Sequence, residues 1–187
     1  CLDEHIMNEA LSNVSAVVCG VGIGNKDAVF PLIEWTIQNV KAPLLIDADG
    51  LNILSQNIEW LSQRVGKTIL TPHIKEMSRL TGYDTDYIKN NKEEVAVEFA
   101  KKYSVTVILK DNVSIITDGK EAINNYTGTP AMAKGGSGDL LSGIAGGLLA
   151  RGIEPLNAAS AAAYIAGSAA SEAVKQSNEY SLLPSDT

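Results

Sequence analysis

The stretch of this 187-residue chain best suited to chemistry is a glycine-rich loop in front of an apolar helix. Residues 133–139 read AKGGSGD, and Leu, Ile, Ala and Gly dominate the residues that follow. Glycines before a helix let successive backbone N–H groups point at one spot, where the helix dipole adds positive potential. The pattern predicts a site for a phosphate or a developing negative charge at Gly135, Gly136, Ser137 and Gly138.

Asp139 lies in the first turn of this predicted helix. An acidic residue there is an ordinary helix-starting residue, which is one interpretation. The other is catalysis, because a carboxylate beside an anion hole can take a proton from a hydroxyl while the hole holds a phosphoryl group. The combination of this aspartate with the glycine loop favours catalysis.

Polar or glycine residues also follow two earlier apolar runs. Asp47 ends residues 43–47, PLLID, where it is well placed to contact a substrate, and the Asp49-Gly50 pair is explained by turn chemistry. Residues 20–24, GVGIG, follow the other run. A lone GxGxG string without the Rossmann spacing and its acidic residue is a weak signal, so a tight turn and a ligand loop both stay open.

Two further segments carry polar residues at the end of apolar runs. His73 and Glu76 lie one turn apart at a predicted helix start. Helix capping explains both, but contact with substrate, or a water-mediated contact of Glu76 with Mg²⁺, is favoured. Two residues are too few for zinc. Lys110 ends its run and is available to a phosphate, whereas Asp111-Asn112 is explained by a hairpin turn.

These residues need a framework that brings strand ends together. Short aliphatic runs alternate with longer stretches of helical periodicity, which predicts βαβ units, a mostly parallel sheet and ligands at the carboxyl ends of its strands. The predicted strands are residues 16–20, 43–47, 68–71, 105–110 and 113–117, and the predicted helices are residues 28–39, 51–55, 76–80, 92–102, 137–151 and 155–174.

The last two predicted helices are rich in Ala and Gly. Glycine lowers helix propensity but permits close approach of a neighbouring element. We therefore expect Gly143, Gly146 and Gly147 to serve helix packing rather than to contact a ligand.

Composition excludes several classes of protein. Fifteen Lys and Arg against 22 Asp and Glu give a net charge of −7, which argues against a nucleic-acid partner. No run approaches the ~18 apolar residues of a membrane span, and no secretory signal opens the chain. Cys1 and Cys19 are too few for a disulfide framework. We expect a cytoplasmic protein that binds no membrane.

Taken together, these segments resemble the ADP/ATP-dependent NAD(P)H-hydrate dehydratases, a branch of the ribokinase-like superfamily. Five motifs in the family's order carry the resemblance and cover nearly all of residues 16–167: CGVGIG, LLIDADGLNIL, ILTPHIKEMSRLTG, VILKDNVSIITDG and NNYTGTPAMAKGGSGDLLSGIAGGLLARG. The resemblance implies a three-layer α/β/α ribokinase-like fold with a mostly parallel central sheet.

The family repairs a nicotinamide cofactor that is hydrated at ring carbon six. The resemblance therefore implies a lyase that turns (S)-NAD(P)H hydrate back into NADH or NADPH, with Mg²⁺ and with ADP, or ATP, as phosphoryl donor. Hydroxide is a poor leaving group, so phosphorylation of the ring hydroxyl converts it into phosphate before elimination. The lone pair of the ring nitrogen can drive that departure.

The resemblance also implies roles for single residues. Asp139 matches the base of the GxGD motif and touches substrate, His73 and Gly22 match further substrate contacts, and Asp47 and Asn52 are the substrate-binding candidates of the second motif. The adenine nucleotide is expected at Lys110, Asp111, Asn112, Val113, Ser114, Gly135, Gly136, Ser137 and Gly138.

The chain departs from the family in two respects. The family's Lys-Gly in the nucleotide loop is Lys110-Asp111 here, which adds a negative charge near a polyphosphate. The family's N-terminal region is longer, so we expect residues 1–187 to be a single domain without its N-terminal portion. An NAD(P)H-hydrate epimerase domain or partner would attach there. The Ala- and Gly-rich helices and acidic charge fit a homo-oligomer, for instance a tetramer.

Two other functions stay open. A small-molecule kinase of the hydroxymethylpyrimidine or hydroxyethylthiazole type shares the GxGD motif and the anion hole, although such kinases more often carry Asn at the position of His73. A non-catalytic nucleotide-binding regulator is the other alternative, and the retention of Asp139 beside an intact glycine loop argues against it.

Overall fold

Short apolar runs form the centre of the molecule as one mixed sheet. The computed structural model describes residues 3–24, 27–132 and 135–176. Within them, a six-stranded sheet has its strands in chain order from β1 to β6. The strands are Val17–Cys19 (β1), Leu44–Ile46 (β2), Thr68–Leu70 (β3), Thr106–Leu109 (β4), Ser114–Thr117 (β5) and Ala122–Asn125 (β6).

The four strands from β1 to β4 are parallel, whereas β5 and β6 add an antiparallel extension. Leu109 pairs with Ile115 across the β4–β5 hairpin, which confirms the turn predicted at Asp111-Asn112. Parallel strands point the same way, so the residues directly after them share one side of the sheet. We call this side the carboxyl edge, and it consists of Gly20, Asp47, Thr71 and Lys110.

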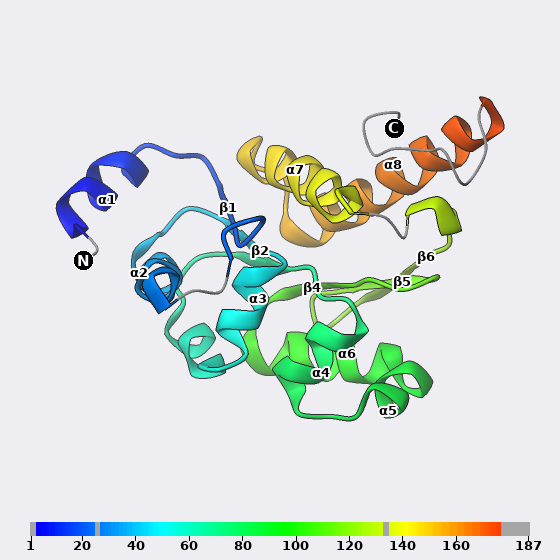
Figure 1. The fold of residues 1–187 in the computed structure, drawn as a ribbon, viewed down its shortest axis with the longest axis horizontal. Helices are drawn as coiled ribbons and strands as arrows, with labels where there is room; N and C mark the ends of the chain where they lie inside the picture. The colour runs from blue at the N-terminus through cyan, green and yellow to red at the C-terminus, as the bar shows by residue number, and fades with distance from the viewer. Residues whose placement is uncertain (1–2, 25–26, 133–134, 177–187) are drawn as a thin grey trace.

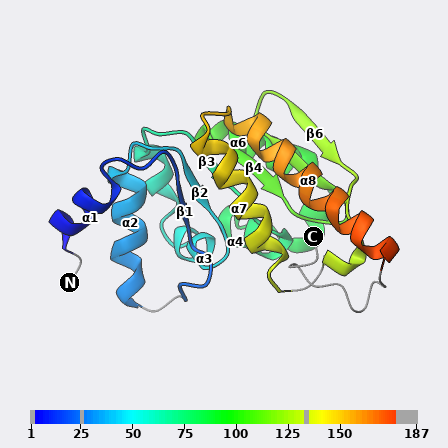
Figure 2. The same cartoon turned by 90° about the horizontal axis from the view of Figure 1, so that it is seen from above.

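Helices cover both faces of the sheet and give three layers (Figure 1). Helices α2 to α6 lie on one face, and α7 and α8 lie side by side on the other (Figure 2). No helix of the described ranges is long and apolar enough to cross a membrane. The helices are Glu4–Leu11 (α1), Phe30–Asn39 (α2), Asp49–Leu54 (α3), Ile74–Thr81 (α4), Thr85–Asn90 (α5), Lys92–Tyr103 (α6), Ser137–Ala150 (α7) and Pro155–Gln176 (α8), with 3-10 turns at Asp27–Val29, Ile58–Gln63 and Pro130–Met132.

The buried strands divide their side chains between two cores. Leu44 and Ile46 of β2 pack with α2 to α6, whereas Leu45 faces the Ala-rich surfaces of α7 and α8. Successive strand side chains point to opposite faces, and a parallel sheet covered on both faces therefore needs continuous apolar runs. This explains why the strands read as uninterrupted aliphatic segments, and it confirms the predicted α/β class with a mostly parallel sheet.

The glycines of α7 differ in their surroundings. A Cβ added at Gly146 would lie 2.3 Å from Val18 Cγ2 of β1, so that Val18 would have to shift, and the predicted packing role is confirmed there. The same expectation is wrong for Gly143 and Gly147, where an added Cβ would meet nothing within 4 Å among the described residues. Only one face of α7 approaches the sheet, and the other two glycines lie off it.

Besides helix α1, strand β6 and helix α5 are absent from the sequence prediction. β6 carries the sequence AINN and is mostly exposed, so it shows no apolar run to signal a strand. It forms because β5 offers a free edge for backbone pairing. The short helix α5 is capped by the Asp84 side chain and buries Ile88 as its single core residue. Both elements owe their existence to neighbours rather than to local periodicity.

Candidate active site

The carboxyl edge brings together polar residues from distant parts of the chain. Asp47 directly follows β2, His73 begins α4 just after β3, and Lys110 directly follows β4. The backbones of His73 and Lys110 form a parallel bridge, and Lys110 N donates to Pro72 O at 2.8 Å. Three of the predicted site residues therefore lie on neighbouring strand ends, as the βαβ pattern predicted.

Asp47 and Lys110 form an ion pair at this edge. Lys110 Nζ donates to Asp47 Oδ1 at 2.8 Å, and the side chains are 22% and 2% exposed respectively. The Ser142 hydroxyl of α7 donates to the other carboxylate oxygen, Oδ2, at 2.8 Å, and Ala48 N donates to Oδ1 at 2.8 Å. One carboxylate therefore joins the end of β2, the end of β4 and helix α7.

The surroundings keep Asp47 ionised. Burial acts to raise the pKa of its carboxyl, but the charge and hydrogen bond of Lys110, with polar contributions from Thr71 and Ser142, outweigh burial and hold that pKa below its ordinary value. A buried carboxylate of this kind is tolerated only because it is paired. Asp47 was predicted to contact substrate, but it is 1% exposed and its carboxylate is bound to protein groups.

The backbone directly after Asp47 is strained. Ala48 has φ 49° and ψ −119°, and among the described non-glycine residues only Ser104 shares a positive φ. Such a conformation costs about 1–3 kcal/mol and tends to occur at functional sites. The strained turn directs the Ala48 N–H at the Asp47 carboxylate. It also starts α3 directly at Asp49.

The ion pair lies under the first turn of α7. A Cβ added at Gly138 would lie 3.5 Å from Asp47 Oδ2 and 3.7 Å from Lys110 Nζ. Gly136 is the N-cap of this helix, and its φ of 96° favours glycine. An anion held at this helix start would meet backbone N–H groups, the positive end of the helix dipole and the Lys110 ammonium.

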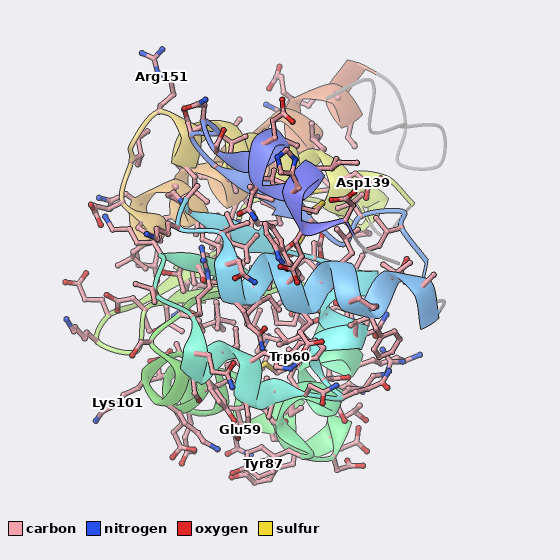
Figure 3. All side chains as sticks on the ribbon, turned by 90° about the vertical axis from the view of Figure 1, so that its left-hand side faces the viewer. Glu59, Trp60, Tyr87, Lys101, Asp139 and Arg151 are labelled. Atoms are coloured by element: carbon pink, nitrogen blue, oxygen red, sulfur yellow. The ribbon has the colours of Figure 1, made fainter. Side chains whose placement is uncertain are left out.

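Asp139 lies in the first turn of α7, is exposed and is labelled in Figure 3. It stands one helical turn before Ser142, the residue that binds Asp47. Of the predicted anion loop, Gly135, Gly136, Ser137 and Gly138 are described, whereas residues 133–134 lie outside the described residues.

His73 and Glu76 form a reciprocal cap at the start of α4. Glu76 N donates to His73 Nδ1 at 3.1 Å, and His73 N donates to Glu76 Oε2 at 2.8 Å. Because Nδ1 accepts a hydrogen bond, the neutral ring carries its proton on Nε2. The other Glu76 oxygen lies 3.6 Å from Nε2, which is too long for a hydrogen bond. The half-exposed His73 ring therefore carries an N–H donor on Nε2.

This cap bears on the Mg²⁺ prediction for Glu76. Its side chain is 7% exposed, and its carboxylate accepts from the His73 backbone. No group of three or more His, Cys, Asp or Glu residues that could hold a metal ion occurs in the described ranges. Capping, the alternative that the sequence left open, accounts for the hydrogen bonds of both side chains, and a water-mediated contact of Glu76 with Mg²⁺ stays a prediction.

The GVGIG loop packs against the segment after β2. A Cβ at Gly20 would lie 2.0 Å from Asp47 O, so only glycine fits at this contact. Gly24 N donates to Asp49 Oδ2 at 2.9 Å, which ties the loop to α3. A Cβ added at Gly22, in contrast, would meet nothing within 4 Å among the described residues.

Asn52, predicted to contact substrate, lies on α3 and accepts from Arg79 Nη1 of α4 at 2.8 Å. Its hydrogen bond joins two helices on the α2–α6 side of the sheet. Among the described residues, no side-chain hydrogen bond connects Asn52 with the Asp47–Lys110 pair.

Lys92 of α6 compensates the charge of Asp111 in the loop of residues 110–114. Lys92 Nζ lies 2.8 Å from Asp111 Oδ2 and 3.3 Å from Asn112 Oδ1, and it also donates to Val113 O at 3.3 Å. Burial acts to raise the pKa of the Asp111 carboxyl, but hydrogen bonds from Lys92 and from the Asn112 backbone hold that pKa below its ordinary value. The Ser114 hydroxyl closes the loop on Asp111 O at 3.4 Å.

Sequence reasoning missed Ser142, Ala48 and Lys92. Ser142 is a polar residue on the buried face of an apolar helix and is three residues after Asp139, which is the signal that could have found it. Ala48 gives no sequence signal, because alanine rarely adopts its conformation. Lys92 is one of many surface lysines until the fold places it beside Asp111.

The chain has a three-layer fold with a glycine-rich helix start over the carboxyl edge. A ribokinase-like superfamily protein from Enterococcus faecalis shares the fold, with a TM-score of 0.84 at 24% identity over 97% of this chain and 62% of that chain. The chain belongs to the NAD(P)H-hydrate dehydratase family, because the family model of that description matches residues 2–186.

Individual relatives agree with this family assignment. The bifunctional NAD(P)H-hydrate repair enzyme Nnr of Moorella thermoacetica is 35% identical over 180 residues, which are 95% of this chain and 34% of that protein. The ADP-dependent (S)-NAD(P)H-hydrate dehydratase of Neisseria meningitidis serogroup B is 34% identical over 168 residues, 88% of this chain and 56% of the relative. This chain thus spans between about a third and 56% of the length of these two relatives.

A solved structure resembles the fold closely. The ADP/ATP-dependent NAD(P)H-hydrate dehydratase from Bacillus subtilis, co-crystallized with ATP/Mg²⁺, has a TM-score of 0.79 and 28% identity, and the match covers 91% of this chain and 60% of that chain.

Proposed function

We propose that the protein containing this chain catalyses the ADP-dependent dehydration of (S)-NAD(P)H hydrate to NAD(P)H. Family membership supports the reaction class. The observation that carries the assignment to this site is the Lys110 ammonium, held under the first turn of α7 with Asp139 in that same turn. This combination supplies a positive charge, an anion hole and a base within one small region.

Each residue of the site has a distinct role in this proposal. Asp139 takes the proton from the ring hydroxyl as a general base. Gly135, Gly136, Ser137 and Gly138 hold the phosphoryl group in transit. The Lys110 ammonium offsets its negative charge, and the loop from Lys110 to Ser114 contacts the adenine nucleotide.

The substrate contacts follow from the same edge. His73 offers its Nε2–H to a polar acceptor of the substrate, and the open backbone at Gly22 contacts substrate from the other side. Asn52, on α3, stays a substrate-binding prediction. Asp47 acts through Lys110 rather than by direct contact, because its carboxylate is buried.

The proposed reaction has two steps, phosphoryl transfer and elimination of phosphate. The deprotonated ring oxygen attacks the terminal phosphorus of ADP, and the bond to the AMP oxygen breaks. The bond between ring carbon six and oxygen then breaks, phosphate leaves with the electron pair, and the ring nitrogen's lone pair supplies electrons. Loss of a proton from ring carbon five completes the double bond. Catalysis of the transfer relies on positioning and charge.

Magnesium would arrive with the nucleotide. Mg²⁺ binds through phosphate oxygens and waters with few protein ligands, which agrees with the lack of a carboxylate cage in the described ranges. The Bacillus subtilis relative was co-crystallized with ATP/Mg²⁺. The preference for ADP rather than ATP rests on the Neisseria relative.

The relatives also suggest partners. The Moorella protein is named as a bifunctional repair enzyme, so we propose that an NAD(P)H-hydrate epimerase domain or partner acts with this chain. A cytoplasmic homo-oligomer, for instance a tetramer, completes the proposal.

The direct test is recovery of reduced-nicotinamide absorbance from purified NADH hydrate. The protein is assayed with Mg²⁺ and ADP, with Mg²⁺ and ATP, and without nucleotide. Recovery only with nucleotide is expected, faster with ADP. A folded protein that binds ADP but recovers no absorbance would overturn the assignment and favour a small-molecule kinase. Such a kinase has a similar fold: the hydroxyethylthiazole kinase of Pyrococcus horikoshii matches this chain with a TM-score of 0.75 at 21% identity.

A further inference from the structure

We propose that Asp47 is a positioning residue whose carboxylate fixes the Lys110 ammonium under α7, so that this charge meets the transferring phosphoryl group. The inference rests on the proposed function and adds a residue that acts through another. Asp47 itself touches neither substrate nor nucleotide, because its carboxylate lies beneath the helix start and is 2% exposed.

Lys110 needs such a partner. A lysine has a flexible four-carbon stem and a compact charge, so it loses much side-chain entropy when it is held in one place. The hydrogen bond to Asp47 Oδ1 uses one of its three ammonium protons. Two protons remain for an anion, and the Gly138 contact places the ammonium next to the helix start where that anion would bind.

Asp47 is itself held on both oxygens. Ala48 N and Lys110 Nζ bind Oδ1, and the Ser142 hydroxyl binds Oδ2. Ser142 belongs to the same helix as Asp139, one turn further along. A single carboxylate therefore sets the distance between the lysine charge and the helix that carries both the anion hole and the base.

Two costs argue that this arrangement serves more than stability. A buried ion pair contributes little net stability and can often be replaced by apolar residues without loss. The Ala48 conformation adds strain at the adjoining residue. Strain and buried charge at one point are expected where geometry matters for the reaction.

The first experiment measures kcat and KM for Asp47→Asn, together with the thermal unfolding midpoint. Asparagine keeps the shape but removes the charge that orients Lys110. We expect kcat to fall about 10²-fold, as for a small misplacement of a reacting group, while the KM for hydrate changes little. Asp86→Asn is the matched control, since it removes an exposed ion pair with Lys89 and should change neither quantity.

A double-mutant cycle then tests whether Asp47 acts through Lys110. In a Lys110→Met background, Asp47→Asn should reduce kcat no further than about threefold, because coupled residues are strongly non-additive. An equal loss in both backgrounds would overturn the proposal, and so would an Asp47→Asn variant that loses stability but keeps kcat. If that variant does not fold, Ser142→Ala replaces it, and an unchanged kcat there overturns the proposal.

A third measurement separates this inference from the proposed function. Acetylation of Lys110 by acetic anhydride is followed by mass spectrometry, with and without ADP. Wild-type Lys110 should react slowly and be protected further by ADP, and Asp47→Asn should abolish both effects. If Lys110 reacts in this way but no NADH is recovered in the assay, the dehydratase function is refuted and the positioning role of Asp47 is not. Equal Lys110 reactivity in wild type and variant would refute the positioning role alone.

Discussion

The two ends of the sheet carry similar charges but hold them differently. At the carboxyl edge, Lys110 and Asp47 form a pair that is 22% and 2% exposed. At the amino end, a hollow of about 850 Å³ contains the Lys67–Glu154 pair at 2.5 Å, whose side chains are 54% and 64% exposed. Figure 3 labels Asp139 and Lys101, which lines this hollow, on opposite sides of the molecule.

The difference shows which charges can serve chemistry. The lysines of the amino-end hollow lie among acidic side chains, including Asp118, Glu121 and Glu154, and water screens them. The carboxyl edge instead has few charges, each oriented by burial, hydrogen bonds and a strained turn. The size of a cavity and the number of charges in it are therefore poorer guides to this site than the burial and hydrogen bonding of a single charged pair.

The largest expected effect compares one aspartate from each end. Asp139→Asn removes the proposed base in the first turn of α7 and should lower the dehydration rate by about 10²–10⁴-fold while nucleotide binding is retained. Asp118→Asn, in the amino-end hollow, should leave the rate unchanged. Steady-state assays and ADP titration measure both. A near wild-type rate for Asp139→Asn would remove Asp139 from the mechanism.

A second comparison removes one lysine from each end. Lys110→Met leaves the Asp47 carboxylate buried and unpaired, which should cost on the order of 3 kcal/mol of unfolding free energy. Lys67→Met breaks an exposed pair and should cost less than about 1 kcal/mol. Urea denaturation gives both values. Equal losses would contradict the contrast between the two ends.

A third prediction concerns acid. Because the folded-state pKa of Asp47 lies below its ordinary value, its ionised form stabilises the fold above about pH 4, the unfolded pKa. This contribution is lost as the pH falls through the folded pKa. Urea denaturation from pH 7 to pH 2 should therefore show a shallower acid slope for Asp47→Asn than for wild type. An identical slope would show that other carboxylates account for the acid dependence.

The smallest expected effect is the change in stability when each of two adjacent glycines of α7 is replaced. Gly146→Ala should destabilise the protein, because the added methyl would collide with Val18 of β1. Gly147→Ala meets open space and should stabilise it by about 0.5–1 kcal/mol through helix propensity. Thermal unfolding of both variants checks the opposite signs. Stabilisation by both would mean that α7 is not packed on β1 as the structure has it.

Much of the framework could be predicted from local pattern. The apolar runs at β1 to β4 and the helical periodicity between them identify the α/β class, because each signal depends only on nearby residues. The β4–β5 hairpin follows in the same way from two apolar runs around Asp111-Asn112. Strand β6 could not be predicted, since its pairing with β5 replaces any apolar pattern of its own.

The candidate site divides along the same line. The sequence alone determines which residue types follow the predicted strands or precede the predicted helices, as at Gly138, Asp139, His73 and Lys110. The tertiary structure alone decides that Asp47 is a buried partner of Lys110, 63 residues away, and of Ser142, 95 residues away. It also decides that Lys92 offsets the charge of Asp111. The physical reason is that local periodicity specifies elements, whereas side-chain pairing across them depends on distances that only packing creates.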